Sequence, residues 1–455
     1  NEELAEIFKN DVITPEDDVY SKQKETDVKV KEAMDDKKYT LENPYVLENP
    51  YYISPLTALI IFQTDSEETV TIEINGQKQE FEKSKKHAIP VYGLVAGKKN
   101  SVKISAGNKS KTLELDMINV KDNLNLTVNI GKGVNLNNGI YLISTPLDTG
   151  LFGFNSNGEM VYKLEGNYNL TIQTLNNGHF LVANEDYLYG VSRTGLLELD
   201  YLGKIYNYYN LEHGYGFEMQ ILKNGNYMLA GGNKAIYFNH QYIYEMNPSD
   251  GKVIDGLDIY KVIKEIDSDF PEKYLGPKAI RNGFYYDEKK GNLVVSFREI
   301  NTVFNFDYKN KKLNYVFTGA DSLFSSDVWK KYLVKVKSGR YPLGQHTPTI
   351  TKDGYLALFN NGYDRYGVAF ENKSNKVGDY NSAMEIYDIK NNVANLVWKS
   401  DFDKKYFSIK YGIFNVLENN HKFMDCGYIL KDGFREKNDN SLVEVEKNVD
   451  DIYSL

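Results

Sequence analysis

A polar turn followed by a short apolar strand recurs along the chain from residue 138 onward. Each copy is followed by a second pair of apolar runs around a further turn, so that one unit holds four strands. Propeller blades take about 40 to 50 residues each, and six such units predict a six-bladed β-propeller. A solenoid fits less well, because the later units carry large insertions and lack a fixed period. The six copies read Asn138-Gly139-Ile140-Tyr141, Asn177-Gly178-His179-Phe180, Asn224-Gly225-Asn226-Tyr227, Lys290-Gly291-Asn292-Leu293, Asp353-Gly354-Tyr355-Leu356 and a degenerate Asn419-Asn420-His421-Lys422-Phe423.

The chain is predicted to have three parts. Residues 1–40 are highly charged with weak helical spacing, which predicts a partly helical amino-terminal segment. Residues 41–135 hold short apolar runs separated by turn signals, which predict a small immunoglobulin-like β-sandwich. Residues 136–455 hold the six repeats and form the predicted propeller. The strands expected in the sandwich are Leu56–Thr64, Thr69–Ile74, Ile89–Leu94, Ser101–Ser105 and Lys111–Met117.

Composition supports an all-β chain and excludes several functions. Aromatic residues make up 13% of the chain, and 37 residues are tyrosine. Aromatic and β-branched residues favour strands. Lys+Arg 54 against Asp+Glu 63 gives a net charge of −9, which argues against non-specific nucleic-acid binding. A single Cys excludes an internal disulfide and a CxxC zinc site. The longest apolar run, Leu56 to Phe62, is too short to span a bilayer, which takes about 20 residues.

The repeat register indicates which residues face the mouth of the propeller channel. His346 lies seven residues before Asp353, which opens its repeat turn, and Arg298 lies seven residues after Gly291. Because equivalent positions of successive blades converge on one axis, we expect these side chains to form a polar, anion-binding cluster. Other residues at or beside the same register position are Phe217, His213, Arg281, Asn282, Gly283, Lys410, Tyr411 and Gly412.

These residues carry a resemblance to a known family. Gly344-Gln345-His346-Thr347-Pro348, together with Leu358-Phe359-Asn360-Asn361-Gly362, resembles the active-site stretch of bacterial arylsulfate sulfotransferases. Gly291-Asn292-Leu293-Val294-Val295-Ser296-Phe297-Arg298 is similar to the segment that carries the sulfate-binding Arg of that family. Glu42-Asn43-Pro44-Tyr45 and Ser54-Pro55-Leu56-Thr57-Ala58-Leu59 resemble the opening motif of its β-sandwich.

The resemblance implies that the chain moves a sulfuryl group from a phenyl sulfate to a phenol, by a ping-pong route through a sulfohistidine. It assigns the nucleophile to His346 and the binding of the sulfuryl oxygens to Arg298 and Asn282. It implies no metal and no cofactor. The chemistry suits these residues, because a neutral imidazole is a competent nucleophile near pH 7 and N–H donors stabilise the equatorial oxygens of such a transfer.

The sequence departs from the family pattern at auxiliary positions. Ile280 and Phe217 stand where the family has histidines, and the family's sixth-blade hydroxyl has no clear counterpart near Tyr411. We therefore expect His213 to assist catalysis and Phe217 and Tyr411 to line the substrate site. The donor of a proton to the leaving phenolate stays open among His213, Tyr215 and Lys278. The alternative hypothesis is a catalytically impaired propeller that binds an anion or a protein partner.

The expected partners are a small phenyl sulfate donor and a phenol acceptor, without nucleic acid and without a membrane span. A second copy of the chain is a further candidate partner, as a homodimer. The sequence begins at Asn1 without Met, which is consistent with a removed leader. We therefore expect an exported, extracytoplasmic protein, secreted or at the cell surface.

Overall fold

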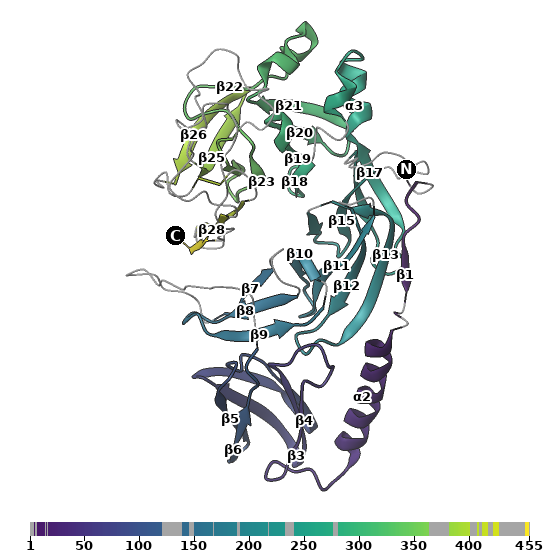
Figure 1. Cartoon of the computed structure of the whole chain (residues 1–455), viewed down its shortest axis with the longest axis vertical. Helices are drawn as coiled ribbons and strands as arrows, with labels where there is room; N and C mark the ends of the chain where they lie inside the picture. The colour runs from purple at the N-terminus through teal and green to yellow at the C-terminus, as the bar shows by residue number, and fades with distance from the viewer. Residues whose placement is uncertain are drawn as a thin grey trace, which may run out of the picture. The chain divides into compact units, whose positions relative to one another are not determined.

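The structure is a computed structural model of the whole chain, and most of its regular elements are β-strands (Figure 1). Its α-helices are α2 (Asp18–Asp35) and α3 (Ile259–Ile266) within the described part of the chain. The prediction of an all-β class is therefore confirmed. The structure describes residues 4, 7–13, 15, 17–120, 139–144, 150–166, 168–188, 192–216, 218–232, 241–275, 281–363, 382–400, 407–408, 412–416, 422–426 and 451–454.

The chain divides into two compact units. The amino-terminal unit comprises Asn10–Asp186 with Arg193–Leu211. The carboxy-terminal unit comprises Glu212–Leu455 with Asn1–Lys9 and Tyr187–Ser192. Every residue that sequence analysis placed at the channel mouth, from His213 to Tyr411, belongs to the carboxy-terminal unit.

The β-sandwich region of the amino-terminal unit is built on one five-stranded sheet. Its order is β2-β3-β5-β6, and β4 pairs with β3. The prediction that one strand ends at Thr64 and another begins at Thr69 is wrong, because β3 continues to Ile74. Its pairing with β4 shifts register between Gln63 and Val70, in the polar stretch. β-Bulges of this kind bend a strand without ending it. The strands are β2 (Tyr45–Glu48), β3 (Ala58–Ile74), β4 (Gln77–Val91), β5 (Lys99–Ala106) and β6 (Lys109–Asp116).

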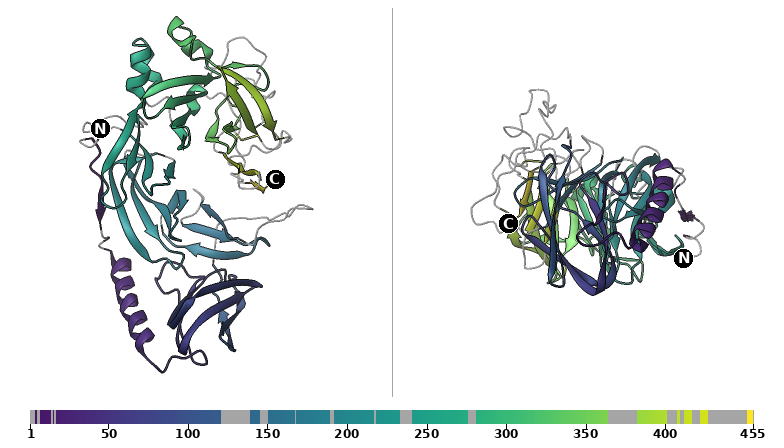
Figure 2. Two further views of the ribbon diagram at one scale, coloured as in Figure 1. Left: turned by 180° about the vertical axis from the view of Figure 1, so that it is seen from behind. Right: turned by 90° about the horizontal axis from the view of Figure 1, so that it is seen from below.

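The first half of β3 is buried on both faces, which explains its continuous apolar sequence. Ile60 and Phe62 pack in the apolar cluster formed by residues of β3, β4 and β5, whereas Leu59 and Ile61 pack with Ala33 of α2. The views in Figures 1 and 2 show α2 alongside this sheet, and its closest strands are β3 and β4. α2 begins at an Asp17 cap whose side chain accepts the Tyr20 N–H. The predicted partly helical segment thus contains one long helix that covers the sheet.

Six further sheets follow the sandwich in chain order within the described ranges, as the repeat predicts. The number of propeller blades stays a prediction. Their strand orders are β7-β8-β9, β1-β13-β12-β11-β10, β14-β15-β16-β17, β18-β19-β20-β21, β22-β26-β25-β24-β23 and β27-β28-β29. The strands before β14 are β1 (Asp11–Ile13), β7 (Tyr141–Ser144), β8 (Leu151–Phe154), β9 (Met160–Leu164), β10 (Tyr168–Thr174), β11 (Phe180–Leu188), β12 (Ser192–Leu199) and β13 (Ile205–Tyr215).

The last four sheets lie in the carboxy-terminal unit, and three of them share a strand pair joined by a glycine turn. In three of them an edge strand is joined to its neighbour by a repeat turn whose glycine, Gly225, Gly291 or Gly354, has a φ of 86°, 72° or 84°. Only glycine takes this left-handed conformation without strain. The strands are β14 (Met219–Ile221), β15 (Tyr227–Gly231), β16 (Tyr242–Met246), β17 (Val253–Asp258), β18 (Arg281–Asp287), β19 (Asn292–Phe297), β20 (Thr302–Asp307), β21 (Lys312–Thr318), β22 (Lys335–Val336), β23 (His346–Ile350), β24 (Leu356–Asn360), β25 (Ala383–Lys390), β26 (Val393–Lys399), β27 (Ile413–Val416), β28 (Lys422–Cys426) and β29 (Asp451–Ser454).

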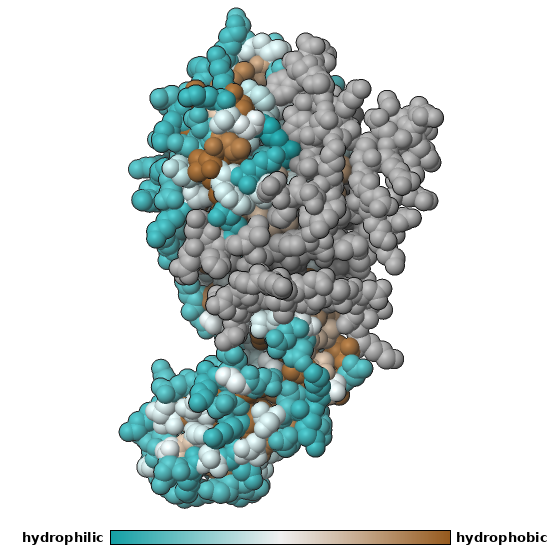
Figure 3. Space-filling view, turned by 90° about the vertical axis from the view of Figure 1, so that its left-hand side faces the viewer, coloured by the Kyte–Doolittle hydropathy of each residue, from teal (hydrophilic) through white to brown (hydrophobic). Residues whose placement is uncertain are grey.

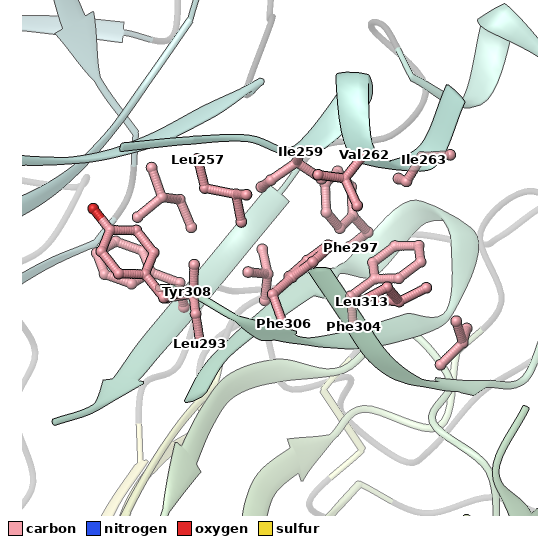
Figure 4. Close-up of a cluster of buried hydrophobic side chains, with 14 of the residues drawn as sticks. Leu257, Ile259, Val262, Ile263, Leu293, Phe297, Phe304, Phe306, Tyr308 and Leu313 are labelled. Atoms are coloured by element: carbon pink, nitrogen blue, oxygen red, sulfur yellow. The ribbon is translucent and has the colours of Figure 1, made fainter. Parts of the chain in front are cut away.

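The largest apolar cluster of the carboxy-terminal unit joins two neighbouring sheets (Figure 4). Leu257 and α3, on one side, pack against Leu293, Phe304 and Phe306 of the sheet β18–β21. Phe297, the last residue of β19, is 1% exposed in this cluster. Its burial fixes the end of β19, the point from which Arg298 extends.

The described part of the surface in Figure 3 is mostly hydrophilic, with apolar residues in small groups. Among the described residues, no helix combines the length and the apolar character that crossing a membrane requires.

Candidate functional site

One edge strand from each of four sheets in the carboxy-terminal unit lies next to the edge strand of the following sheet. β14 contacts β18, β18 contacts β23, and β23 contacts β27. Side chains at the start of each strand therefore share one region, as the repeat register predicts. His346 is the first residue of β23.

The segment before His346 is shaped by Gly344. This residue has a φ of 61°, and a Cβ atom in its place would collide with the carbonyl oxygen of Tyr363. The Gly344 N–H donates to Asn301 Oδ1 at 2.8 Å. A side chain at this position is therefore excluded by both the backbone conformation and the close approach of another backbone.

The imidazole of His346 is 7% exposed and is held through Nδ1. Nδ1 lies 2.7 Å from Asn361 Oδ1 and 3.1 Å from the Gly344 carbonyl oxygen. The Asn361 amide is oriented because its Nδ2 donates to the Ser408 carbonyl oxygen at 3.0 Å. Both neighbours of Nδ1 are then acceptors, so Nδ1 carries the proton and the lone pair of the neutral ring is on Nε2.

The residue after His346 has a strained backbone. Thr347 has a φ of 43°, and the pairing of β23 with β24 shifts register between His346 and Thr349. Thr347 Oγ1 accepts the Phe414 N–H at 3.0 Å and donates to the Gly412 carbonyl oxygen at 3.3 Å. A left-handed β-branched residue inside a bulge is uncommon, and such strain concentrates at functional sites.

Asn282 is linked to the segment that carries His346. Its Nδ2 donates to the Gln345 carbonyl oxygen at 2.7 Å, and its Oδ1 accepts from Ser296 Oγ at 2.8 Å. The Gln345 side chain is fully buried and donates through Nε2 to Ser296 Oγ at 2.9 Å and to the Thr302 carbonyl oxygen at 3.0 Å. This network joins β18, β19 and β20 to Gln345, the residue before His346.

Arg298 lies in the short 3-10 turn that follows β19, from Arg298 to Ile300. Its side chain is 11% exposed and its Nη2 contacts Glu299 Oε1. The same turn ends at Asn301, with a φ of 51°, whose side chain holds Gly344. The turns that carry Arg298 and His346 are therefore bonded to each other.

Two further ionisable groups lie beside the site. Arg281 is 1% exposed, its Nη1 donates to the Tyr242 carbonyl oxygen at 3.1 Å, and burial lowers its pKa to about 10. Glu218 precedes β14 and is partly exposed, and its Oε2 accepts the Phe284 N–H at 2.7 Å. Burial raises the pKa of Glu218 to about 7, against the opposing effects of that hydrogen bond and of Arg281.

The structure brings together three of the residues expected from sequence, namely His346, Asn282 and Arg298, through Gln345 and Asn301. His213 lies in β13, but its side chain is outside the described part of the structure. The other expected residues, one alternative proton donor and one position where the family has a histidine lie outside the described residues as well. These are Phe217, Tyr411, Ile280 and Lys278. Tyr215 is fully buried at the end of β13.

Sequence reasoning assigned no role to Asn361, Gln345 or Glu218, although the first two lie in the stretches that resemble an active site. Asn361 was detectable, because a hairpin about Asp353-Gly354 pairs His346 with Phe359 and so brings the residues after β24 close to the start of β23. Gln345 and Glu218 carried no comparable signal, because their contacts cross between sheets that lie far apart in the sequence.

Some solved structures show a distant likeness to this chain. Regucalcin, a calcium-binding protein of Agrobacterium tumefaciens, has 11% identity, covers 66% of this chain and 81% of its own, and gives a TM-score of 0.35. A gluconolactonase of Xanthomonas campestris has 8% identity, covers 61% of this chain and 75% of its own, and gives a TM-score of 0.34. No curated protein sequence matches this chain significantly.

Two family profiles match adjoining parts of the chain. The arylsulfotransferase Ig-like domain matches residues 45–121, in agreement with the predicted sandwich. The arylsulfotransferase (ASST) family matches residues 120–453, which include all six repeats. Together they cover most of the chain, and they support a sulfotransferase with small-molecule substrates. The chain belongs to the arylsulfotransferase (ASST) family.

Proposed function

We propose that this chain transfers a sulfuryl group from a phenolic sulfate ester to a phenolic acceptor, through a covalent intermediate on Nε2 of His346. The observation that carries the proposal is the arrangement around Nδ1, where Asn361 Oδ1 at 2.7 Å and the Gly344 carbonyl oxygen both accept. This arrangement favours the neutral tautomer whose Nε2 is the nucleophile.

The proposed first step forms a bond between Nε2 and sulfur and breaks the bond between sulfur and the phenolic oxygen. The sulfated ring becomes cationic, and the two acceptors on Nδ1 stabilise that charge. In the second step an acceptor phenol attacks the sulfur, and the electron pair of the N–S bond returns to Nε2. The same sulfuryl oxygens must be bound in both steps.

Arg298 and Asn282 are the proposed ligands of the sulfuryl oxygens. A guanidinium has five N–H donors, and the described contact with Glu299 uses one nitrogen. The Asn282 amide has a second N–H besides the one that Gln345 accepts. Asn282 also positions His346 through Gln345, so its substitution is expected to affect binding and rate together.

The test is turnover of 4-nitrophenyl sulfate with and without an added phenol. We expect nitrophenol release that depends on the acceptor and is abolished by His346→Ala. His179→Ala is the matched control, because His179 is a half-buried histidine whose Nδ1 contacts Glu198 at 2.7 Å in the amino-terminal unit. Release without an acceptor would indicate a sulfatase instead, and absence of release from several donors would favour the anion-binding alternative.

We also propose that the protein acts outside the cytoplasm, as its family resemblance implies. Fractionation of cells that produce the chain from its natural gene is the test. Recovery of the protein with the cytoplasmic fraction would contradict this location.

A further inference from the structure

The transfer proposed above needs a group that protonates the leaving phenolate and deprotonates the acceptor phenol. Ile280 and Phe217 occupy the positions at which the resemblance leads one to expect histidines, and neither side chain can exchange a proton. The carboxylate of Glu218 is an ionisable group close to the segment that carries His346, and sequence analysis assigned it no role.

Glu218 is tied to the strand beside His346. It stands directly before β14, and β14 contacts β18, which in turn contacts β23. Its Oε2 accepts the Phe284 N–H at 2.7 Å, which is the hydrogen bond that the described residues provide to this carboxylate. Oε1 is not needed for that contact, so the carboxyl group can hold a proton on Oε1 while Oε2 keeps its backbone partner.

Gly283, which has no side chain, lets this carboxylate and the Pro348 ring approach its backbone closely. A Cβ atom on Gly283 would lie 3.0 Å from Glu218 Oε2, 3.2 Å from Glu218 Oε1 and 2.9 Å from Pro348 Cδ. The two carboxylate oxygens and the Pro348 ring therefore flank the same side of Gly283. Pro348 is two residues after His346 in β23, so the carboxylate lies beside the strand that carries the nucleophile.

The surroundings of Glu218 suit proton exchange near neutral pH. The side chain is partly exposed, yet loss of hydration raises its pKa to about 7, with Arg281 as the opposing charged group among the described residues. A carboxyl group whose pKa is raised by burial next to a specific charged neighbour is a candidate functional group. A general acid or base works best when its pKa is close to the operating pH.

We infer that Glu218 is the proton-transfer residue of the sulfuryl transfer, an inference that rests on the function proposed above. In the first step the Glu218 carboxyl gives its proton to the phenolic oxygen as the S–O bond breaks, and it is left as a carboxylate. In the second step the carboxylate takes the proton of the acceptor phenol as its oxygen bonds to sulfur. The carboxyl group is thereby restored, and no other reactant is consumed.

Gln220 offers a matched control for the structural role of Glu218. Two residues further along the chain, Gln220 Oε1 accepts the Tyr286 N–H at 2.8 Å and Nε2 donates to the Tyr286 carbonyl oxygen at 2.9 Å. Both residues therefore link β14 to the backbone of β18. The Gln220 amide is neither an acid nor a base near pH 7, so its substitution affects only the hydrogen bonds to the Tyr286 backbone.

The test compares two donors that differ in the basicity of the leaving phenolate, in Glu218→Gln, Glu218→Asp and Gln220→Ala. For Glu218→Gln we expect a loss of about 10²-fold or more in kcat/KM with phenyl sulfate, whose leaving group needs a proton, and less than about 10-fold with 4-nitrophenyl sulfate. Glu218→Asp should recover part of the activity with phenyl sulfate. Gln220→Ala should change both donors by the same factor.

The pH profile gives a second readout. With phenyl sulfate, kcat/KM of the wild-type protein should fall as pH rises above about 7, because the acid loses its proton, and Glu218→Gln should lack this limb. An equal loss with both donors in Glu218→Gln, with the pH limb retained, would overturn the inference. Failure of the wild-type protein itself to form a sulfated intermediate would overturn the proposed function instead, so the two failures are distinguishable.

Discussion

At the scale of single residues, the protonation of His346 depends on Asn361. The Asn361 amide accepts from Nδ1 because its own nitrogen is bound to the Ser408 carbonyl oxygen. Asn361→Ala removes one of two acceptors, so we expect sulfation by donor to slow by about 10- to 100-fold, as is typical for the partner of a functional histidine. Stopped-flow release of nitrophenol in the first turnover is the measurement, with Asn157→Ala in an exposed turn as control.

The conservative change Asn361→Asp should move the pH dependence. An aspartate can accept from Nδ1, but its charge favours the imidazolium and raises the pKa of His346. The nucleophile must be neutral, so the acidic limb of the pH profile should move to higher pH. An unchanged acidic limb in the first-turnover rate would show that Asn361 does not contact the reacting ring.

Glu218 should affect the pH dependence of the free energy of unfolding as well as activity. Its pKa is raised from 4.5 to about 7 in the folded chain. Between these values the folded protein holds a proton that the unfolded chain has lost, so stability should fall as pH rises from about 4.5 to 7. Urea unfolding at pH 5 and pH 8 should show a smaller pH-dependent loss in Glu218→Gln than in the wild-type protein. An equal loss in both would contradict this.

The chemistry-bearing residues were predictable from sequence only in part. His346, Asn282 and Arg298 follow from the repeat register and the motif, because each belongs to a short local pattern. The contacts of Asn361, Gln345 and Glu218 become visible only once the pairing of strands is known, although the first two residues lie in the quoted motifs. Their hydrogen bonds join segments that the sequence separates by 15 to 66 residues.

At the scale of elements, the turn before β23 depends on Gly344. Gly344→Ala adds a Cβ atom that meets the Tyr363 carbonyl oxygen, and it also imposes a positive φ on alanine. We expect a loss of about 2 to 4 kcal/mol in the free energy of unfolding. Gly291→Ala is the control, because Gly291 has a φ of 72° with no atom near its added Cβ, and it should cost about 1 to 2 kcal/mol. Equal losses in urea unfolding would contradict the close approach at Gly344.

The strands of the sheets were easier to predict than their irregularities. Alternation and turn glycines indicate the hairpins about Gly225, Gly291 and Gly354, and the structure has them. The bulge at Thr347 and the unbroken course of β3 past Thr64 had no such signal. Both depend on pairing with a neighbouring strand, and a polar residue inside a long strand looks like a turn in the sequence alone.

At the scale of the whole molecule, each compact unit has its own buried contacts. In the amino-terminal unit, Gln23 of α2 is 2% exposed. Its Nε2 donates to the Tyr51 and Gly203 carbonyl oxygens at 3.0 and 2.9 Å, and its Oε1 accepts the Ile205 N–H at 2.9 Å. The helix is therefore bonded both to the segment before β3 and to the start of β13.

Gln23→Ala leaves these buried backbone groups without their partner, so we expect a loss of about 2 to 4 kcal/mol in unfolding free energy. Because the site residues lie in the carboxy-terminal unit, kcat and KM at 25 °C should not change. Calorimetry and steady-state assays are the measurements, with the exposed Gln77→Ala as control. A large change in kcat without any change in stability would contradict the assignment of the site to one unit.

The propeller class and the sandwich were predictable at this scale, because six similar repeats and a separate group of strands are visible in the sequence. The division into two compact units was not, since the amino-terminal unit combines the sandwich with strands that sequence analysis assigned to the propeller. Contacts between distant segments determine such a division, and a repeat pattern does not report them.

The most direct test of the account is the mass of the protein after incubation with 4-nitrophenyl sulfate alone, followed by peptide mapping. We expect one added sulfuryl group per chain, located on His346, which disappears when a phenol is added and is absent in His346→Ala. A sulfuryl group on a different residue, or no covalent product while nitrophenol is released in an acceptor-dependent manner, would contradict the central claim.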